Sequence, residues 1–154
     1  MIVVWRGLDA FRTEYAHLRI DGDRLFAHGT QLGIEPTPYL LHYRLQPDRL
    51  AVEIDDGPSL ELELGDHDAF DLGFSPLFNS IPIIRDRLHQ GGQGRDYRMA
   101  WVSVPELAVE ESMQQYEPLA LGRIRFSAGD FAAVLELDRD GIVRRYEGLA
   151  ERVA

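Results

Sequence analysis

The sequence predicts an all-β fold, mainly antiparallel, formed as one domain over residues 1–154. Hydrophobic and polar residues alternate along most of the chain, turn residues interrupt the alternation about every ten residues, and helical spacing is confined to one segment. Alternation with a period of two places hydrophobic side chains on one face of a sheet and charged side chains on the other. A sheet with so little helix to cover it must fold on itself or close. It then either leaves room for a small ligand or is filled by its own side chains, as in a sandwich.

The first half of the chain predicts consecutive antiparallel strands. Hydrophobic residues alternate over residues 16–20 and again from residue 25, and the intervening Asp21-Gly22-Asp23 is a hairpin signal. Three further alternating runs cover residues 39–45, 50–54 and 60–64, with turns at residues 46–48 and 55–58.

The second half continues this pattern with less regular runs. Strands are predicted over residues 97–104, 107–116, 123–126, 131–137 and 142–146, with a turn at residues 138–141.

Residues 75–88 are the exception to the strand pattern. Pro76 suits the first position of a helical turn, and hydrophobic residues follow at helical spacing. Pro82 lacks a backbone donor and is expected to break the segment, so we predict one or two short helical turns. The glycines of residues 91–94 predict a flexible loop, because the strand and helix that a phosphate-binding loop requires do not flank them.

The composition excludes several classes of function. The net charge is −10, and arginine supplies all 16 basic residues. This acidity argues against a nucleic-acid partner and against an anionic membrane surface. Without cysteine, disulfides, thiolate nucleophiles and cysteine-type zinc sites are excluded. No segment is apolar enough to serve as a signal peptide or an integral membrane segment, so the expected compartment is the cytoplasm.

Three histidines raise the question of a metal site. If residues 21–24 form a four-residue loop, His17 faces His28 across the hairpin, and His42 lies on the same polar face. A two-residue turn at Asp21-Gly22 instead places Phe26 opposite His17. Neighbouring arginines would repel a cation, so we expect outer-face histidines with no metal and no cofactor.

Catalytic residues are not predicted. Glu53, Glu61 and Glu63 alternate outward on strands, and Asp66, Asp68 and Asp71 are expected in a loop. No spacing brings two carboxyl groups into one cleft, and no G-x-S-x-G nucleophile elbow is present. An enzymatic function is therefore less favoured than binding.

Residues 71–85 form the candidate functional segment. They pack Phe, Leu and Ile between Gly and Pro, so they form either a plug for an open barrel end or a lid over a cavity. In a lid, the polar groups of Asn79 and Arg85 would orient a ligand. The full candidate ligand-binding set adds four aromatic residues on or near strands and comprises Tyr43, Phe74, Asn79, Arg85, Trp101 and Tyr116.

Several of these stretches resemble the bacterial putative glycolipid-binding family. They are residues 6–9, 14–25, 29–30, 71–85, 101–107 and 141–149, and the stretch 71–85 resembles the most recognisable motif of the family. The resemblance implies a strongly bent antiparallel sheet that forms an incomplete barrel around an apolar cavity, as in bacterial lipoprotein carriers. It brings no catalytic residues. Family members usually have a longer stretch before the position of Asp71, so a shallower cavity or one open side is expected here.

The expected function is non-enzymatic binding of an amphipathic small molecule, such as a glycolipid. One alternative is a small hydrolase or isomerase that uses the same cavity. Another is a homodimeric interaction module with a filled core, in which exposed strand edges pair.

Overall fold

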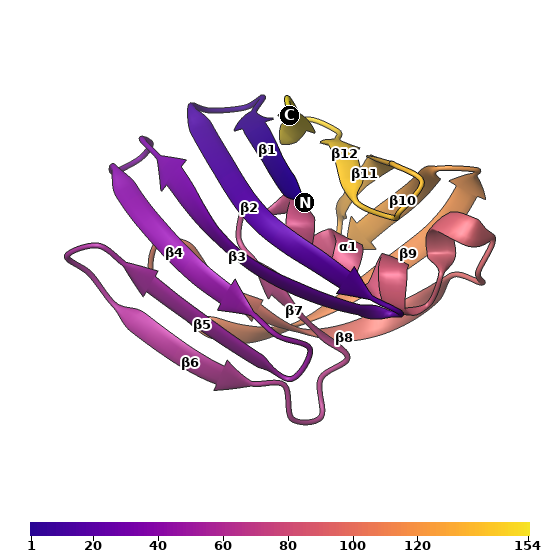
Figure 1. Ribbon diagram of the computed structural model, residues 1–154, viewed down its shortest axis with the longest axis horizontal. Coiled ribbons are helices and arrows are strands. Elements are labelled where there is room, and N and C mark those ends of the chain that lie inside the picture. Colours follow the sequence, from indigo (N-terminus) through magenta and orange to yellow (C-terminus); the bar gives the residue numbers. More distant parts are fainter.

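The computed structural model describes residues 1–154 as a single 13-stranded sheet that bends around one α-helix (Figure 1). The strands are β1 Ile2–Gly7, β2 Arg12–Asp21, β3 Arg24–Gly33, β4 Tyr39–Leu45, β5 Arg49–Ile54, β6 Ser59–Glu63, β7 Ala69–Leu72, β8 Arg95–Val102, β9 Val109–Ala120, β10 Arg123–Ala128, β11 Phe131–Leu137, β12 Val143–Tyr146 and β13 Ala150–Arg152. Their order in the sheet is β6-β5-β4-β3-β2-β1-β13-β12-β11-β10-β9-β8-β7. Neighbouring strands are antiparallel, except that β7 and β8 run parallel.

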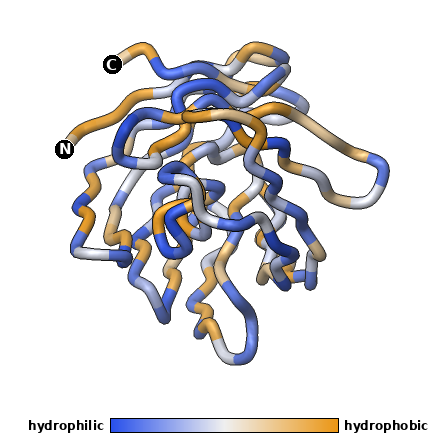
Figure 2. Tube along the Cα trace, turned by 90° about the vertical axis from the view of Figure 1, so that its right-hand side faces the viewer, coloured by the Kyte–Doolittle hydropathy of each residue, from blue (hydrophilic) through white to orange (hydrophobic).

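The predicted all-β class and the bent, incomplete barrel are confirmed. The two edge strands, β6 and β7, follow one another in the chain, but they do not pair with each other. The sheet is therefore open at the place where the connecting stretch is short. Figure 2 shows hydrophobic and hydrophilic residues alternating along the strands, which is the pattern that predicted them.

The two ends of the chain join the halves of the sheet. Strand β1 pairs with β13, with Trp5 opposite Arg152. The Trp5 indole N–H donates a hydrogen bond of 2.8 Å to the carbonyl oxygen of Val143. Strands β1, β7 and β13 were not predicted. Strands β7 and β13 contain four and three residues, which is too short for an alternation to be recognised.

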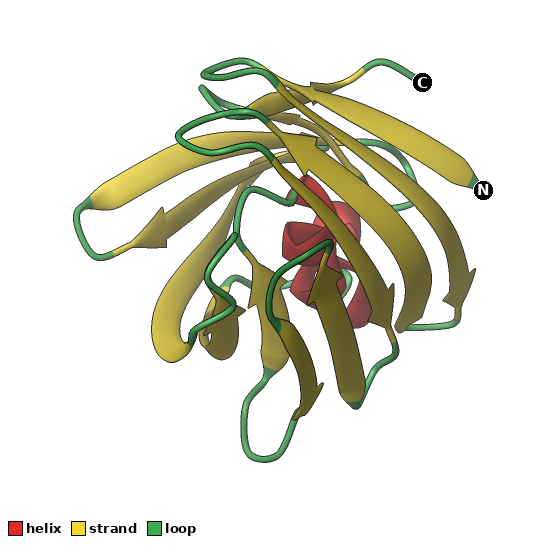
Figure 3. Cartoon of the chain, turned by 90° about the vertical axis from the view of Figure 1, so that its left-hand side faces the viewer, coloured by secondary structure: helices red, strands yellow, loops and turns green.

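Helix α1, Pro76–Arg85, lies inside the curve of the sheet (Figure 3). Leu77, Phe78 and Ile84 belong to a hydrophobic cluster of 23 buried residues built mainly on β1–β5. Ile83 belongs to a second cluster of 13 buried residues built mainly on β8–β12. The helix is hydrophobic on nearly all sides because the sheet surrounds it. It lies within the curve of the sheet, where the apolar cavity was expected.

The expectation that Pro82 would break the helical segment was wrong. Helix α1 has ten residues and continues through Pro82 to Arg85, and a short 3₁₀ helix, η1, Leu88–Gln90, follows it. Pro82 removes one backbone hydrogen bond, but packing against the sheet on both sides offsets that loss. No helix in the structure is long and apolar enough to cross a bilayer.

Candidate functional site

The largest recess lies at the end of the molecule where α1 finishes, and we call it the end recess. Its volume is about 1040 Å³. Its lining residues belong to the tip of the β2–β3 hairpin, the α1–η1 segment and the turn that joins β11 to β12. Residues from both faces of the hairpin line it, so the recess wraps around the hairpin tip.

Hydrophobic side chains form the inner wall of the end recess. They come from β2, β3, the end of β4 and α1 and are Leu18, Ile20, Ala27, Leu45 and Ile84. The register explains the position of three of them, because Leu18 pairs with Ala27 and Ala27 pairs with Leu45. This row crosses three adjacent strands on the face that packs toward α1. Leu18, Ala27, Leu45 and Ile84 are buried in the core, and Ile20 is half-buried, so the floor of the recess is apolar and Ile20 is its most accessible side chain.

Arginine and histidine side chains line the end recess on two sides. Arg87, Arg139 and His89 lie on the segments opposite the apolar wall, and the others lie on the outer face of β2–β4, away from that wall. Four arginines line the end recess, namely Arg19, Arg44, Arg87 and Arg139, together with three histidines, His17, His28 and His89. Asp140 is the acidic residue among the lining residues. The whole chain has 26 acidic and 16 basic residues, so the recess reverses the charge balance of the protein. A cleft lined by one sign of charge raises the local concentration of ligands of the opposite sign.

A second recess of about 580 Å³ lies on the outer face of β2–β6 and contains His28 and His42. The register settles the question that the hairpin left open: Asp21 pairs with Arg24, and His17 faces His28 with ring centroids 5.1 Å apart. His42 lies elsewhere on this face, where Nδ1 is 3.1 Å from the Thr30 hydroxyl and Nε2 is 3.3 Å from Asp55. The structure contains no group of three or more side chains arranged to hold a metal ion.

Tyr43, the first of the six predicted ligand-binding residues, belongs to a buried polar network at the start of α1. Its hydroxyl donates to Glu14 Oε1 at 2.8 Å, and the Ser75 hydroxyl donates to the same oxygen at 2.7 Å. The Tyr43 ring lies against the backbone of Gly29, where an added Cβ would be 2.5 Å from the ring. Glycine at position 29 thus allows a side chain on β4 to reach across β3 to β2.

Glu14 was not identified from the sequence, although it lies on the face of β2 that predicts burial. Burial raises the pKa of its carboxyl group from 4.5 to about 7, while hydrogen bonds from Ser75 and Tyr43 and the charge of Arg12 oppose this rise. Its second oxygen, Oε2, is buried without a hydrogen-bond partner. The pKa of this carboxyl group therefore lies well above that of an exposed glutamate.

Asn79 and Tyr116 belong to a second buried network, on the other side of α1. The Asn79 amide donates to the Tyr116 hydroxyl at 3.0 Å, and that hydroxyl donates to Gln114 Oε1 at 3.2 Å. The Gln114 amide donates to Asp71 Oδ2 at 2.7 Å. The two networks attach both sides of α1 to the sheet through side chains that face inward.

Asp71 was expected in a loop, and this expectation was wrong. It lies in β7, whose four residues are all buried, because β7 is covered by α1 on one face. Burial raises the pKa of its carboxyl group from 3.8 to about 6, against hydrogen bonds from Gln114 and the Leu72 backbone.

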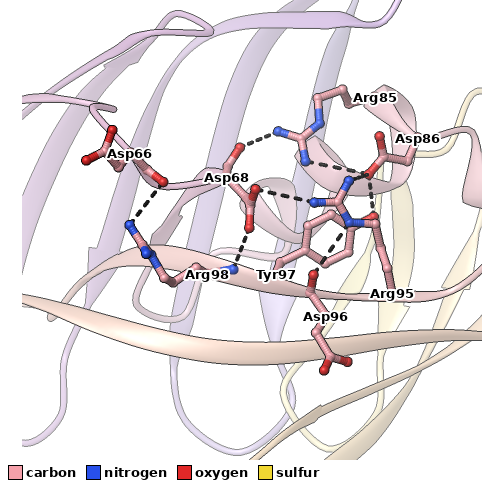
Figure 4. Close-up of polar contacts among 8 residues, drawn as sticks. All are labelled: Asp66, Asp68, Arg85, Asp86, Arg95, Asp96, Tyr97 and Arg98. Carbon is pink, nitrogen blue, oxygen red and sulfur yellow. Dashed lines mark hydrogen bonds and ion pairs between the residues drawn. The ribbon is translucent and has the colours of Figure 1, made fainter.

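Arg85 lies in a charged cluster that connects the end of α1 to β7 and β8 (Figure 4). Its guanidinium donates to the backbone oxygen of Asp68 and is 3.5 Å from the Asp86 carboxylate. Arg95 bridges the same two acids, with nitrogen–oxygen distances of 3.3 Å to each. Tyr97 completes the cluster by donating to Asp86 at 2.6 Å. The donors of Arg85 are thus already engaged within the protein.

Phe74 and Trp101 lie apart from both networks. Phe74 is at the opposite end of α1 from the end recess, where the Arg12 guanidinium lies 4.1 Å from its ring centroid. Trp101 is half-buried on β8, opposite Glu110. None of the six predicted residues lines the end recess, and Tyr43 is the one among them that borders the outer recess.

The end recess itself was missed because its lining residues are far apart in the sequence, from Met1 to Asp140. No local motif connects the hairpin at residues 21–24 with the turn at residues 138–141. The available signal was the number of arginines at predicted turns and strand ends, which sequence reasoning alone does not place together.

Comparisons with known proteins match the fold as a whole. The model of a family described as putative glycolipid-binding matches residues 54–152, which is more than half of the chain. A crystal structure of a DUF1089 family protein from Pseudomonas aeruginosa is similar, with a TM-score of 0.72 and 25% sequence identity. The similarity covers 91% of this chain and 92% of that chain. No curated protein matches this sequence.

Proposed function

This chain belongs to the putative glycolipid-binding family, and from that premise we propose that it binds an amphipathic small molecule, such as a glycolipid, without catalysing a reaction. The proposed site is the end recess. The hydrophobic tail of the ligand lies along the apolar wall of the recess, and the polar head lies among the charged residues of the rim.

One observation carries this proposal: the end recess brings apolar side chains of the sheet and of α1 next to the arginines of the α1–η1 segment and the β11–β12 turn. Its volume of about 1040 Å³ is in the range of small-molecule sites. A ligand that is apolar throughout would leave the arginines without a partner, and a fully polar ligand would make no apolar contact with Ile20 and the residues beside it. An amphiphile satisfies both surfaces.

The proposed setting is the cytoplasm of a bacterium. A chain without cysteine needs no oxidising compartment in order to fold. The six residues predicted from the sequence stay a prediction as ligand contacts. Of these, Tyr43, Asn79 and Tyr116 are buried between α1 and the sheet, and Tyr43 also borders the outer recess.

The enzymatic alternative required ionisable groups that point inward. Glu14 and Asp71 do so, but α1 covers both, and neither lines the end recess or the outer recess. We therefore assign no reaction to them. The alternative of a homodimeric module also stays a prediction, for which the free edges of β6 and β7 provide the pairing surface.

Native mass spectrometry tests the proposal directly. Protein purified from its host, or incubated with single-chain glycolipids that carry dodecyl to octadecyl tails, should retain one amphiphile per chain. Each added methylene should strengthen binding by about 0.8 kcal/mol until the apolar wall is covered. A protein that stays empty with every tail length would contradict the proposal.

A pair of variants tests the site. Ile20→Glu places a charge on the apolar wall of the end recess and should weaken glycolipid binding at least tenfold. Leu121→Glu makes the same kind of change at a residue that is 90% exposed and outside the recess, so it should bind as the unmodified protein does. Equal binding by the two variants would show that the ligand lies elsewhere.

A further inference from the structure

The charges around the end recess indicate which head group it selects. The protein carries a net charge of −10, yet four arginines and one aspartate line this recess. Two of the arginines, Arg87 and Arg139, come from the segments that face the apolar wall of the hairpin, namely the α1–η1 connection and the β11–β12 turn.

Neither of the two acids next to Arg139 in sequence, Asp138 and Asp140, forms an ion pair with it. The Asp138 carboxylate accepts hydrogen bonds from the backbone N–H groups of Asp140 and Ile142, at 2.9 and 3.0 Å. It also forms an ion pair of 2.8 Å with Arg152. Asp138 therefore holds the turn in shape, and the Arg139 guanidinium, which is exposed, forms no ion pair.

Arg87, like Arg139, has an acidic neighbour in sequence that is engaged by other groups. The adjacent Asp86 carboxylate is occupied by Arg95, Arg85 and Tyr97. Arg87 has a left-handed backbone conformation at the start of η1, and its carbonyl oxygen accepts hydrogen bonds from Gln90 and Gly92, so the backbone at this position is fixed. Its side chain is exposed and forms no ion pair.

The two segments that carry these arginines also contact each other. At Gly141 an added Cβ would lie 3.0 Å from His89 Nδ1 and 3.0 Å from Ile84 Cγ1, so the β11–β12 turn packs directly on the end of α1 and on η1. Two unpaired guanidinium groups are thus supplied by two touching backbone segments beside the apolar wall. Guanidinium groups bind phosphate and carboxylate oxygens through pairs of charge-assisted hydrogen bonds.

We propose that the end recess selects amphiphiles whose head group is negatively charged, with Arg87 and Arg139 contacting the head group. This inference rests on the proposed function and adds the ligand class to it. The shared chemistry is an anionic group next to an aliphatic chain, and the anion is either a phosphate ester or a carboxylate.

The test compares amphiphiles that share one dodecyl tail and differ in head group. Dodecyl phosphate, dodecanoate, dodecyl maltoside and dodecyltrimethylammonium are titrated below their micelle concentrations, with calorimetry as the readout. The anionic ligands should bind about tenfold or more tightly than the maltoside, and the cationic ligand should bind most weakly. The preferred one of the two anionic ligands identifies the head group as phosphate or carboxylate.

Variants then assign the preference to residues. The double variant Arg87→Gln/Arg139→Gln should bind the anionic ligands no better than it binds the maltoside. A circular dichroism spectrum and a urea midpoint equal to those of the unmodified protein report an intact fold. Arg125→Gln is the matched control, because Arg125 is an exposed arginine on β10 outside the recess. Arg44→Gln removes an arginine of the recess that lies on the outer face of β4, next to His28, and it should keep the preference for anionic ligands.

The outcomes separate this inference from the proposed function. Equal affinity for the maltoside and the anionic ligands would overturn the inference and leave amphiphile binding intact. Loss of the anionic preference in Arg44→Gln but not in the double variant would overturn the assignment to Arg87 and Arg139. Binding of none of the four ligands would contradict the proposed function itself.

Discussion

At the scale of single residues, two carboxyl groups are buried within the curve of the sheet. Glu14 accepts hydrogen bonds from Tyr43 and Ser75, and Asp71 accepts one from Gln114. Loss of hydration on burial exceeds the effect of these hydrogen bonds, so the pKa of each group is raised. Both groups are attached to the segments that hold α1, which makes the folded state sensitive to pH.

The raised pKa of Glu14 predicts how stability depends on pH. An unfolded chain releases this proton near pH 4.5 and the folded protein near pH 7, so the folded state holds more protons between these values. The free energy of unfolding should therefore fall as pH rises through this window, by on the order of 3 kcal/mol. Urea unfolding at a series of pH values measures it.

The variant Glu14→Gln should remove this part of the pH dependence, because its amide oxygen still accepts hydrogen bonds from Tyr43 and Ser75 but does not titrate. The Glu14→Gln variant should still lose stability as pH rises between about 3.8 and 6, because the pKa of Asp71 is raised as well. Glu53→Gln, on the exposed outer face of β5, is the control and should keep the slope of the unmodified protein. A Glu14→Gln variant with an unchanged slope would disprove this account.

At the scale of elements, α1 is the centre of the core. It contacts the strands of both halves of the sheet, and its buried residues belong to both hydrophobic clusters. A helix in this position needs little intrinsic helix propensity, because most of its stability comes from tertiary packing. This explains how it retains Pro82.

Shortening a buried side chain of α1 should therefore lower the stability of the fold. Leu77 is completely buried, and Leu77→Ala should lower the free energy of unfolding by about 2 to 5 kcal/mol through lost burial and a residual cavity. Leu121→Ala, at a residue that is 90% exposed, should change it by less than about 0.5 kcal/mol. Similar values for the two variants in chemical denaturation would show that α1 is only loosely attached.

At the scale of the whole molecule, the sheet is long, bent and open. Its two edges, β6 and β7, differ in protection. All four residues of β7 are buried, whereas none of the residues of β6 is fully buried. An edge strand has unpaired backbone groups on one side, so β6 is the part of the sheet most available for exchange or for pairing with another chain.

Hydrogen exchange followed by mass spectrometry tests this difference. Peptides that cover β6 should exchange faster than peptides that cover β2 and β3, which pair with strands on both sides. Protection of β6 that increases with protein concentration would indicate the predicted homodimer. Strong protection of β6 in the dilute monomer would contradict the open edge.

The sequence by itself determined the regular part of the fold. Alternation predicted β2–β6 and most of β8–β12, because the two faces of each strand meet different surroundings. The same alternation predicted hydrophobic residues on the inner face of the sheet and charged residues on its outer face. Strands β7 and β13 were too short to produce a readable pattern, and the parallel pairing of β7 with β8 depends on contacts that only the folded sheet provides.

Tertiary structure alone decided the site. The end recess joins residues of the β2–β3 hairpin, the α1–η1 segment and the β11–β12 turn, whose proximity follows from the bend of the whole sheet. The continuation of α1 through Pro82 and the burial of Asp71 have the same origin, since packing outweighs the local preference of each residue. Local preference acts between neighbours in the chain, whereas burial and charge at a site depend on everything that surrounds it.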